Sequence, residues 1–533
     1  MFTNLFRTFV AFSVLLATLI LPTTSFAQAQ EVATSPQQNS SWPKLTITVD
    51  PPTLRTPSDE DDSKSKSARR KPIPFRPTMD TELYVAAKQA AAHQVVPPPI
   101  ERPEPDFQIS AQPVPISSFE GVDQATAGGL FPPDTHGAVG RDYFVEVTNS
   151  HLDIFTKSGI RVRSISLNNF FQYFNQTLFD PRVVYDAIFD RWVIIAPALR
   201  ESGAVQRFFI AASTGPDPLG SYFFYNLNVT RNFGDFFDYP QLGLHSNAVI
   251  VTANIFPASG AVYANVYTIP INRLYSGGSL IMAQFTNLPG STIAPPVVLD
   301  TNPNAFLVSA PPQGSALNLY RLSNLLIPSS TTLNGPFSVA VPFYSVPPDA
   351  QQPSPCTGAT NNLDTLDSRF VNASTQSGDS LWQVHTVTVN TSFGPRPRPK
   401  FYQINTVINR LMQSGSFSAT QTSYDFNASI AANSGEDVFV TWSGTDPSRG
   451  VNAQVLVSGR RASDPFNVIP SGLPVATSQT CITGNFDSRF GTQRWGDYSA
   501  VTVDPTDSLT GWIVNEKINS TTQWGSRIGK VIF

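Results

Sequence analysis

The sequence has little charge of either sign. Of its 533 residues only 14% are Asp, Glu, Lys or Arg, and the formal net charge is −4. A protein that binds nucleic acid needs a basic surface for the phosphates, so this composition excludes nucleic acid as an expected partner. Charged helix formers are scarce, whereas Phe (38), Pro (46) and Gly (32) are plentiful. The composition therefore favours many strands joined by turns.

Local signatures of metal and phosphate sites are also missing. The histidines form no His-x-x-x-His or His-Glu-x-x-His pair, and there is no phosphate loop or Gly-x-Gly-x-x-Gly. Local spacing therefore gives no support for a zinc or nucleotide site. The sequence does not identify a cofactor. A structural calcium ion is compatible with its carboxylates but has no motif.

Cysteine is almost absent, since only Cys356 and Cys481 occur. In an exported chain two cysteines form either a disulfide or two buried thiols. Both stand in similar settings, Pro355-Cys356-Thr357-Gly358 and Thr480 to Gly484, each a few residues before an Asp-Ser-Arg-Phe. We predict a disulfide that ties together two neighbouring or near-neighbouring units.

Long hydrophobic runs are missing after the first 27 residues. Arg7 is followed by an apolar stretch from Thr8 to Pro22 and by the small-residue sequence Ser25-Phe26-Ala27, which is the pattern of a cleaved secretory signal. The alternative is a transmembrane anchor, but the run is shorter than the roughly 20 residues that span a bilayer. We therefore expect a protein that is secreted, periplasmic or at the cell surface.

Residues 28–105 show no apolar period. Proline-rich pieces surround a mixed-charge run from Asp59 to Lys71, and such a composition cannot offset the entropy that ordering costs. We predict a disordered linker. Within it, alanine-rich residues 79–93 favour one helix, with Asp80 near its start.

Residues 106–533 consist of short β-type runs separated by Gly, Pro, Asn and Asp. Several runs open on an acidic or amide residue and continue into apolar ones, and two further strand-like runs follow most openings. Three or four antiparallel strands per unit, repeated about seven times, predict an all-β fold, a β-propeller of about seven blades, with six as the alternative count. Two tandem β-sandwiches would not repeat one polar opening per unit, and a β-helix needs a much shorter repeat.

The polar openings are the candidate site. In a propeller the innermost strand of each blade lines the axis, so the residues that open these strands should meet at one mouth of the central channel. The predicted binding set is Asp134, His136, Asp180, Arg182, Asp238, Tyr239, Asp367, Arg369, Arg494, Asp497 and Tyr498. No catalytic residue is assigned.

Several ordered strings across residues 120–533 carry a family resemblance. They include Pro133-Asp134-Thr135-His136-Gly137-Ala138-Val139-Gly140, Leu366-Asp367-Ser368-Arg369-Phe370, Arg494-Trp495-Gly496-Asp497-Tyr498-Ser499 and Arg527-Ile528-Gly529. In these strings the chain resembles a group of uncharacterised exported bacterial β-propeller proteins. The resemblance implies a propeller and export, and it carries over no catalytic residues.

Two functions suit such a polar mouth. The first is a binding or structural module outside the cytoplasm, with a glycan or protein as ligand. The second is a sialidase-like glycan hydrolase, in which Arg182, Arg369 and Arg494 would hold a carboxylate, Tyr498 with Glu516 would supply the nucleophile and Asp134 would transfer the proton. The Ser-x-Asp-x-Gly-x-Thr-Trp turn of that superfamily is absent, so we expect a binding module rather than an enzyme.

Overall fold

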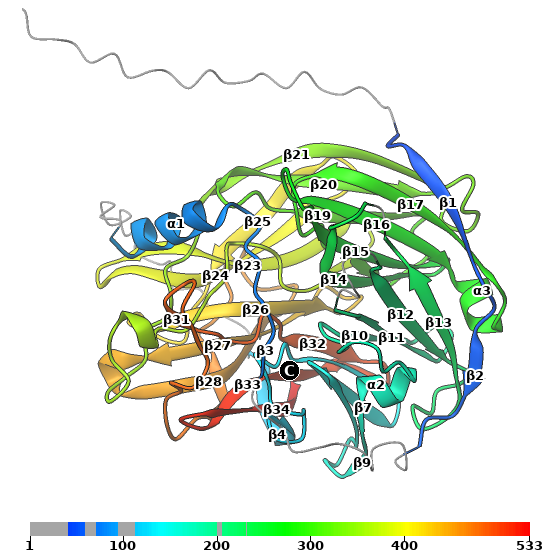
Figure 1. The fold of residues 1–533 in the computed structure, drawn as a ribbon. Coiled ribbons are helices and arrows are strands. Elements are labelled where there is room, and N and C mark those ends of the chain that lie inside the picture. The colour runs from blue at the N-terminus through cyan, green and yellow to red at the C-terminus, as the bar shows by residue number, and fades with distance from the viewer. Residues whose placement is uncertain (1–40, 59–70, 94–111, 200–204, 231) are drawn as a thin grey trace, which may run out of the picture. The chain divides into compact units, whose positions relative to one another are not determined.

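The computed structural model describes residues 41–58, 71–93, 112–199, 205–230 and 232–533 (Figure 1). All of them belong to one of the two units of the chain, residues 39–533. The predicted signal peptide, residues 1–27, lies outside the described residues.

Within the described residues the strands group into seven blades of four strands each. The first blade contains β6 (His136–Val139), β7 (Tyr143–Thr148), β8 (His151–Thr156) and β9 (Arg161–Ser166), and the second contains β10 (Arg182–Asp186), β11 (Arg191–Pro197), β12 (Arg207–Ser213) and β13 (Tyr222–Asn228). The third blade contains β14 (Phe236–His245), β15 (Ala248–Phe256), β16 (Tyr263–Pro270) and β17 (Leu280–Pro289). The fourth contains β18 (Pro296–Val298), β19 (Asn304–Ser309), β20 (Gly314–Ser323) and β21 (Thr332–Tyr344). The other three are β22 (Ser374–Ser377), β23 (Ser380–Thr391), β24 (Gly394–Asn405), β25 (Arg410–Ser416); β26 (Tyr424–Ala432), β27 (Val438–Asp446), β28 (Val451–Arg460), β29 (Leu473–Thr477); and β32 (Ala500–Asp504), β33 (Asp507–Ser520), β34 (Gln523–Ile532), β4 (Val114–Asp123).

The first strands of the seven blades form a closed ring. Each contacts the next in the order β6, β10, β14, β18, β22, β26 and β32, and β32 contacts β6 again. In the fourth blade β18 pairs in parallel with β14 and β22, and the bridge between Ala294 and Val308 connects it to β19. The predicted all-β propeller is confirmed. The count of about seven blades agrees with the structure, which rejects six blades, tandem sandwiches and a β-helix.

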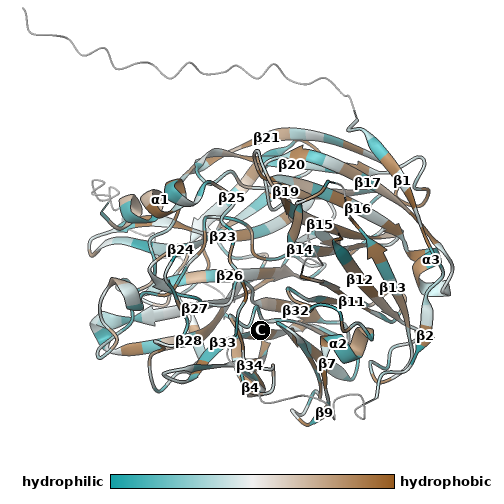
Figure 2. Ribbon diagram, viewed as in Figure 1, coloured by the Kyte–Doolittle hydropathy of each residue, from teal (hydrophilic) through white to brown (hydrophobic). Residues whose placement is uncertain are grey.

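Each pair of neighbouring blades encloses its own hydrophobic core. Each hydrophobic cluster lies between two consecutive sheets, and such clusters are found all around the ring. The last one joins the seventh blade to the first through Trp512, Phe144 and Phe155. Figure 2 shows apolar residues along the strands of these sheets. A sheet that buries both faces needs apolar side chains on both sides, so the abundant phenylalanines serve packing between blades.

The seventh blade is completed by a strand that precedes the first blade in sequence. β4 pairs antiparallel with β34, with Ser117 opposite Lys530, and the blue-to-red colouring of Figure 1 places these two ends of the domain side by side. The buried carboxylate of Glu146 on β7 accepts a hydrogen bond of 2.9 Å from the Val122 N–H of β4. Gly121 is required there, because a Cβ would lie 2.3 Å from the Glu146 carboxylate oxygen. The ring is thus closed by the two ends of the repeat region.

The structure corrects part of the predicted disordered linker. Residues 44–49 form β1 (Lys44–Val49), which adds an outer strand to the third blade, and β2 (Thr53–Arg55) adds one to the second. Outer propeller strands expose unpaired N–H and C=O groups, and a β-branched run such as Thr46-Ile47-Thr48 can pair with them. Residues 28–40, 59–70 and 94–105 of the predicted linker lie outside the described residues.

The next part of that linker is ordered as well. β3 (Lys71–Pro72) pairs in parallel with β5 (Leu130–Phe131), and α1 (Thr81–His93) lies within the predicted helix 79–93. Asp80 accepts hydrogen bonds from the N–H groups of Glu82 and Leu83 at the start of the helix. The remaining short elements are α2 (Leu167–Phe171), α3 (Ile271–Ser276), η2 (Ala359–Asn361), η3 (Pro447–Arg449), β30 (Phe486–Asp487) and β31 (Thr492–Gln493).

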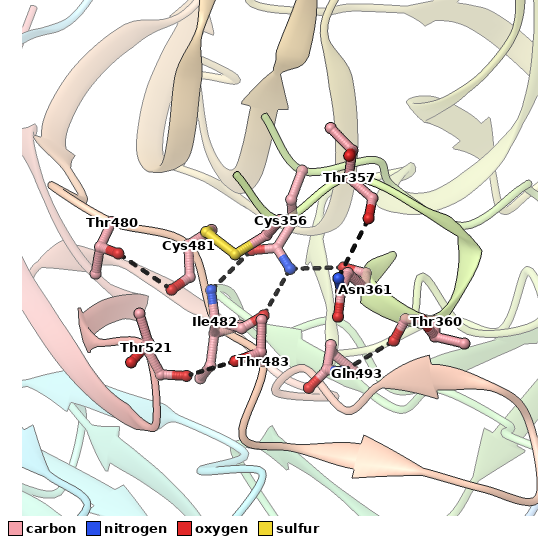
Figure 3. The surroundings of a disulfide bond; sticks show 11 residues. Cys356, Thr357, Thr360, Asn361, Thr480, Cys481, Ile482, Thr483, Gln493 and Thr521 are labelled. Atoms are coloured by element: carbon pink, nitrogen blue, oxygen red, sulfur yellow. Dashed lines mark hydrogen bonds between the residues drawn. A yellow bond between two sulfur atoms is a disulfide. The ribbon is translucent and has the colours of Figure 1, made fainter. Parts of the chain in front are cut away.

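Cys356 and Cys481 form the predicted disulfide, with Cα atoms 6.2 Å apart. It joins the connection that precedes the fifth blade to the connection that precedes the seventh (Figure 3). Gln352 strengthens the same junction, because its side chain accepts from the Ile482 N–H at 2.9 Å and donates to the Ile482 carbonyl at 2.7 Å. Two long connections are therefore fixed to each other.

Candidate functional site

The blade openings share a backbone conformation that explains their composition. Asp134, Asp180, Tyr239, Thr292 and Asn427 all have φ between 46° and 54°, in the left-handed region. Asp and Asn tolerate this region better than most residues. The recurrent acidic or amide residue at the start of a unit thus reflects the turn that delivers the chain to the axis.

The openings are also connected to one another. The Asn149 side chain donates to the Asp134 carboxylate and accepts from the Asp180 N–H. Asp134 in turn accepts from the Asp497 N–H at 2.7 Å. These bonds link the first, second and seventh blades near the axis.

Two arginines at this end of the axis are held by carboxylates. Arg494 contacts Asp364 and Asp497, both at 2.8 Å, and Arg369 binds Asp367 with two bonds of 2.7 and 2.8 Å. Bidentate pairing of this kind is the strong form of an ion pair. All of these side chains are buried.

The third arginine, Arg182, donates its hydrogen bonds to backbone carbonyls rather than to a carboxylate. Arg182 is fully buried, donates to the carbonyls of Pro240 and Val371, and stacks on the Tyr498 ring at 3.4 Å. The Tyr498 hydroxyl donates to Asp180 at 2.7 Å, and its ring lies 4.9 Å from that of Tyr239.

The structure therefore brings most of the predicted set together. Asp134, Asp180, Asp238, Tyr239, Arg369, Arg494 and Asp497 line one small space, with Arg182, Asp367 and Tyr498 behind them; we call this group the polar mouth. His136 is the exception. Its Nε2 contacts the Asn372 side chain at 3.0 Å, and it faces a separate cavity farther along the axis.

Burial controls the charges of the polar mouth. It raises the pKa of Asp497 to about 8, although the Arg494 guanidinium opposes the shift. Burial, together with the neighbouring carboxylates of Asp238 and Asp134, raises the pKa of Asp180. The pKa of Asp367 is lowered to about 2; burial opposes this, but the Arg369 ion pair and the Thr78 hydrogen bonds outweigh it. The mouth thus combines carboxyls that favour the neutral form with one that is held ionised.

Residues 71–79, which we call the covering segment, close the polar mouth. Ile73, Pro74, Phe75 and Arg76 line it together with the propeller residues, and the space that remains is about 10 Å³. Phe75 lies against the guanidinium groups of Arg494 and Arg369, at 4.6 and 5.3 Å from its ring centre. A sugar has no room in this state.

Sequence reasoning missed the partners that complete the mouth, namely Asn149, Asp364, Phe75 and Arg76. Asp364 had a local signal, since it stands three residues before Asp367 in the same opening. Phe75 and Arg76 had none, because their partners in the mouth, such as Arg369 and Asp238, are far away in the sequence.

A cavity of about 390 Å³ lies on the axis beyond the polar mouth; we call it the axial cavity. Each of the seven innermost strands contributes to its wall, with His136, Val183, Leu242, Val297, Thr375, Ile430 and Val501 as one residue from each. The lining holds few ionisable groups. Burial lowers the pKa of His136 to about 3, so its imidazole is neutral, and Asp504 is paired with Lys157 at 2.9 Å.

A wider groove of about 830 Å³ runs beside α1. Its lining includes Gln89 of the helix, Gln352 near the disulfide, Phe393 and Tyr424. It lies off the axis and contains none of the predicted site residues.

Among the described residues no group of three or more His, Cys, Asp or Glu side chains is arranged to hold a metal ion. Likewise, no helix in the described ranges has the length and apolar character needed to cross a membrane.

No protein-family model matches the chain, and a search of curated proteins found no match. The family resemblance in the sequence motifs therefore stays a prediction. Solved structures give weak likenesses. A Trypanosoma rangeli sialidase in complex with sialic acid has a TM-score of 0.35 at 10% identity; the match covers 72% of this chain and 57% of the sialidase, so the chain spans little more than half of that protein.

The Dos1 propeller gives a TM-score of 0.35 at 7% identity, over 72% of this chain and 75% of that one. The haemagglutinin-neuraminidase ectodomain of parainfluenza virus 5 gives 0.38 at 9% identity, over 68% and 87%. Scores this low assign no activity. The propeller stands on the strand topology itself.

Proposed function

We propose that this protein is an exported binding module that takes an uncharged ligand into the axial cavity. The observation that carries the proposal is that all seven innermost strands line one cavity of about 390 Å³. This volume is within the usual range of about 300–1,000 Å³ for small-molecule sites. The polar mouth is filled by the chain itself and holds the blades together.

The chemistry of the wall supports an uncharged ligand. Val183, Leu242 and Val501 supply apolar surface, whereas Asn372 and Thr375 supply hydrogen-bonding groups. A ligand charge would have no free counter-charge in this lining, because His136 is neutral and Asp504 is paired with Lys157. Burial of an unpaired charge is costly. Neutral sugars, with apolar faces and many hydroxyl groups, fit this description.

Export is supported by two features of different kind. The chain has a signal-like N-terminal sequence, and its two cysteines form a disulfide. Disulfides persist mainly in oxidising compartments outside the cytosol.

A panel of neutral mono- and disaccharides tests the proposal by thermal shift. We expect at least one sugar to raise the Tm of the wild-type chain and to leave that of Ala373→Phe unchanged, because Ala373 lines the cavity and a phenyl ring would fill it. Ala462→Phe, at an exposed position on another surface, is the matched control and should respond like wild type. If no sugar acts, or if Ala373→Phe responds fully, this assignment is wrong.

Sialidase-type hydrolysis at the polar mouth is the second candidate. The observation that favours it is that Arg182 and Arg369 lie over the rings of Tyr498 and Tyr239, and Arg494 lines the same space. Two contacts argue against hydrolysis. The Tyr498 hydroxyl donates a hydrogen bond to Asp180 rather than to Glu516, and Phe75 occupies the space that a substrate would need. We expect no turnover of a fluorogenic sialoside. Turnover that Tyr498→Phe abolishes would reverse the preference.

A further inference from the structure

The covering segment binds the polar mouth in the way a peptide binds a receptor. The segment is extended, and it begins with the short parallel pairing of β3 with β5. The Ile73 N–H continues this pairing with a hydrogen bond of 2.8 Å to the Phe131 carbonyl. Pro74 and Pro77 flank the two residues in the mouth. Proline restricts the unbound chain, so less entropy is lost on binding.

Phe75 occupies an aromatic and cationic pocket. The guanidinium groups of Arg494 and Arg369 lie 4.6 and 5.3 Å from its ring centre. The rings of Tyr84 and Phe490 lie 5.6 and 5.2 Å away. Guanidinium contacts of this kind favour an aromatic side chain over an aliphatic one of similar size.

Arg76 is recognised through both its side chain and its backbone. The guanidinium lies 3.6 Å from the Asp238 carboxylate and 3.7 Å from the centre of the Phe236 ring. Arg369 donates to the Arg76 carbonyl at 3.1 Å. Two residues later, Thr78 donates from its N–H and its hydroxyl to one oxygen of Asp367, at 2.9 and 2.8 Å.

The mouth itself contains more carboxyls than guanidinium groups. Without the covering segment, the mouth contains the carboxyls of Asp134, Asp180, Asp238, Asp364, Asp367 and Asp497 but only the guanidinium groups of Arg182, Arg369 and Arg494. Arg76 supplies a positive charge beside Asp238; burial raises the pKa of that carboxyl, and the Arg76 guanidinium opposes the shift. Its side chain is still 31% exposed, so this part of the contact is open to a competitor.

We propose that the polar mouth is a peptide-recognition site, which binds an extended segment of a partner protein carrying an aromatic residue followed by arginine between prolines. The chain's own Pro74-Phe75-Arg76-Pro77 is the resident ligand and is displaced by the partner. The covering segment shows which chemistry the mouth accepts, since Phe75, Arg76 and Thr78 each meet a matching group. This site is separate from the axial cavity and does not depend on the proposed function.

A labelled synthetic peptide with the sequence of residues 71–80 tests the proposal by fluorescence anisotropy. The full-length variant Phe75→Ala/Arg76→Ala removes both resident side chains and leaves every propeller residue in place. We expect saturable binding of the peptide to this variant and at least tenfold weaker binding to wild type, whose mouth is occupied at high effective concentration. A peptide with alanine in place of its phenylalanine should bind the variant about tenfold more weakly.

Thr78→Ala is a second variant that guards against misfolding of the first. It removes the hydroxyl hydrogen bond to Asp367 and keeps the backbone N–H bond, so it should admit the peptide to an intermediate extent. If both variants melt cooperatively and neither binds the peptide, the proposal is wrong. If the wild-type chain is a dimer that Phe75→Ala/Arg76→Ala dissociates, the segment comes from a second copy, which contradicts binding of a different partner protein.

Discussion

Glu146 is a buried carboxyl at the point where the ring closes. Burial raises its pKa to about 8, and its hydrogen bond to Val122 opposes the shift. At pH values between the ordinary pKa near 4.5 and about 8, Glu146 holds a proton in the folded protein and releases it in the unfolded chain. The contribution of the protonated Glu146 carboxyl to the free energy of unfolding is therefore complete at the lower end of this pH window and is lost as the pH rises through about 8.

The Glu146→Gln variant tests this account, because its amide resembles the protonated acid at every pH. We expect the free energy of unfolding of Glu146→Gln to improve relative to wild type as the pH rises from 5 to 7.5, by up to about 1.4 kcal/mol per pH unit. Urea denaturation at several pH values measures it. Glu120→Gln, which removes an exposed carboxylate on β4, is the control. Parallel curves for wild type and Glu146→Gln would show that Glu146 is ionised in the folded state.

The helix α1 depends on one buried lysine. Lys88 lies 2.9 Å from Asp349 and 3.7 Å from Asp364, and its ammonium group donates to the Thr365 hydroxyl at 2.7 Å. The helix also presents Tyr84, whose hydroxyl donates to Asp364 at 2.9 Å. Removal of one partner from a buried ion pair leaves an uncompensated charge and costs about 3–5 kcal/mol.

Lys88→Met should therefore detach the helix rather than unfold the ring. We expect amide hydrogen exchange over residues 81–93 to become at least tenfold faster in Lys88→Met, whereas the blade strands keep their protection. Gln89→Met, on the exposed neighbouring position, should exchange at the wild-type rate. Equal rates in the two variants would mean that the ion pair does not hold the helix.

At this scale the sequence predicts some elements and not others. The blade strands have local signals, because an opening such as Asp180-Pro181-Arg182 combines a left-handed turn with the start of an apolar run. β1 has no such signal of its own, since its partner on β17 is far along the chain, with Lys44 opposite Phe285. The proline-rich pieces and the mixed-charge run of this region therefore masked an ordered segment.

Some features of the candidate site could likewise be predicted from the sequence, and others could not. Convergence of Asp134, Asp180 and Asp497 could be predicted because repeated units place equivalent residues around one axis. The axial cavity could not, since the innermost strands line it mainly with ordinary residues such as Val183 and Thr375, which carry no motif. Occupation of the mouth by Phe75 depends on a tertiary contact that leaves no local pattern.

The whole molecule depends on closure of the ring. Six of the seven blades take their four strands from one continuous stretch of sequence, whereas the seventh combines β32, β33 and β34 with β4 from before the first blade. Every inter-blade core is then complete, including the one between the seventh and first blades. The polar mouth and the axial cavity exist only if this ring closes, because all seven innermost strands line the axial cavity and the mouth joins residues from the openings of the first and seventh blades.

Disulfide trapping between β4 and β34 tests ring closure most directly. Ser117 and Lys530 are opposite each other in the antiparallel pair, and the Cβ atoms of such pairs lie about 4.5–5.5 Å apart, close to the distance that a disulfide spans. In Ser117→Cys/Lys530→Cys, mass spectrometry of the purified monomer should find the two cysteines linked within one chain. Ser118→Cys/Lys530→Cys, shifted by one residue to the other face of the strand, should stay largely unlinked. Absence of the intramolecular bond in the first variant would contradict the closed seven-bladed ring.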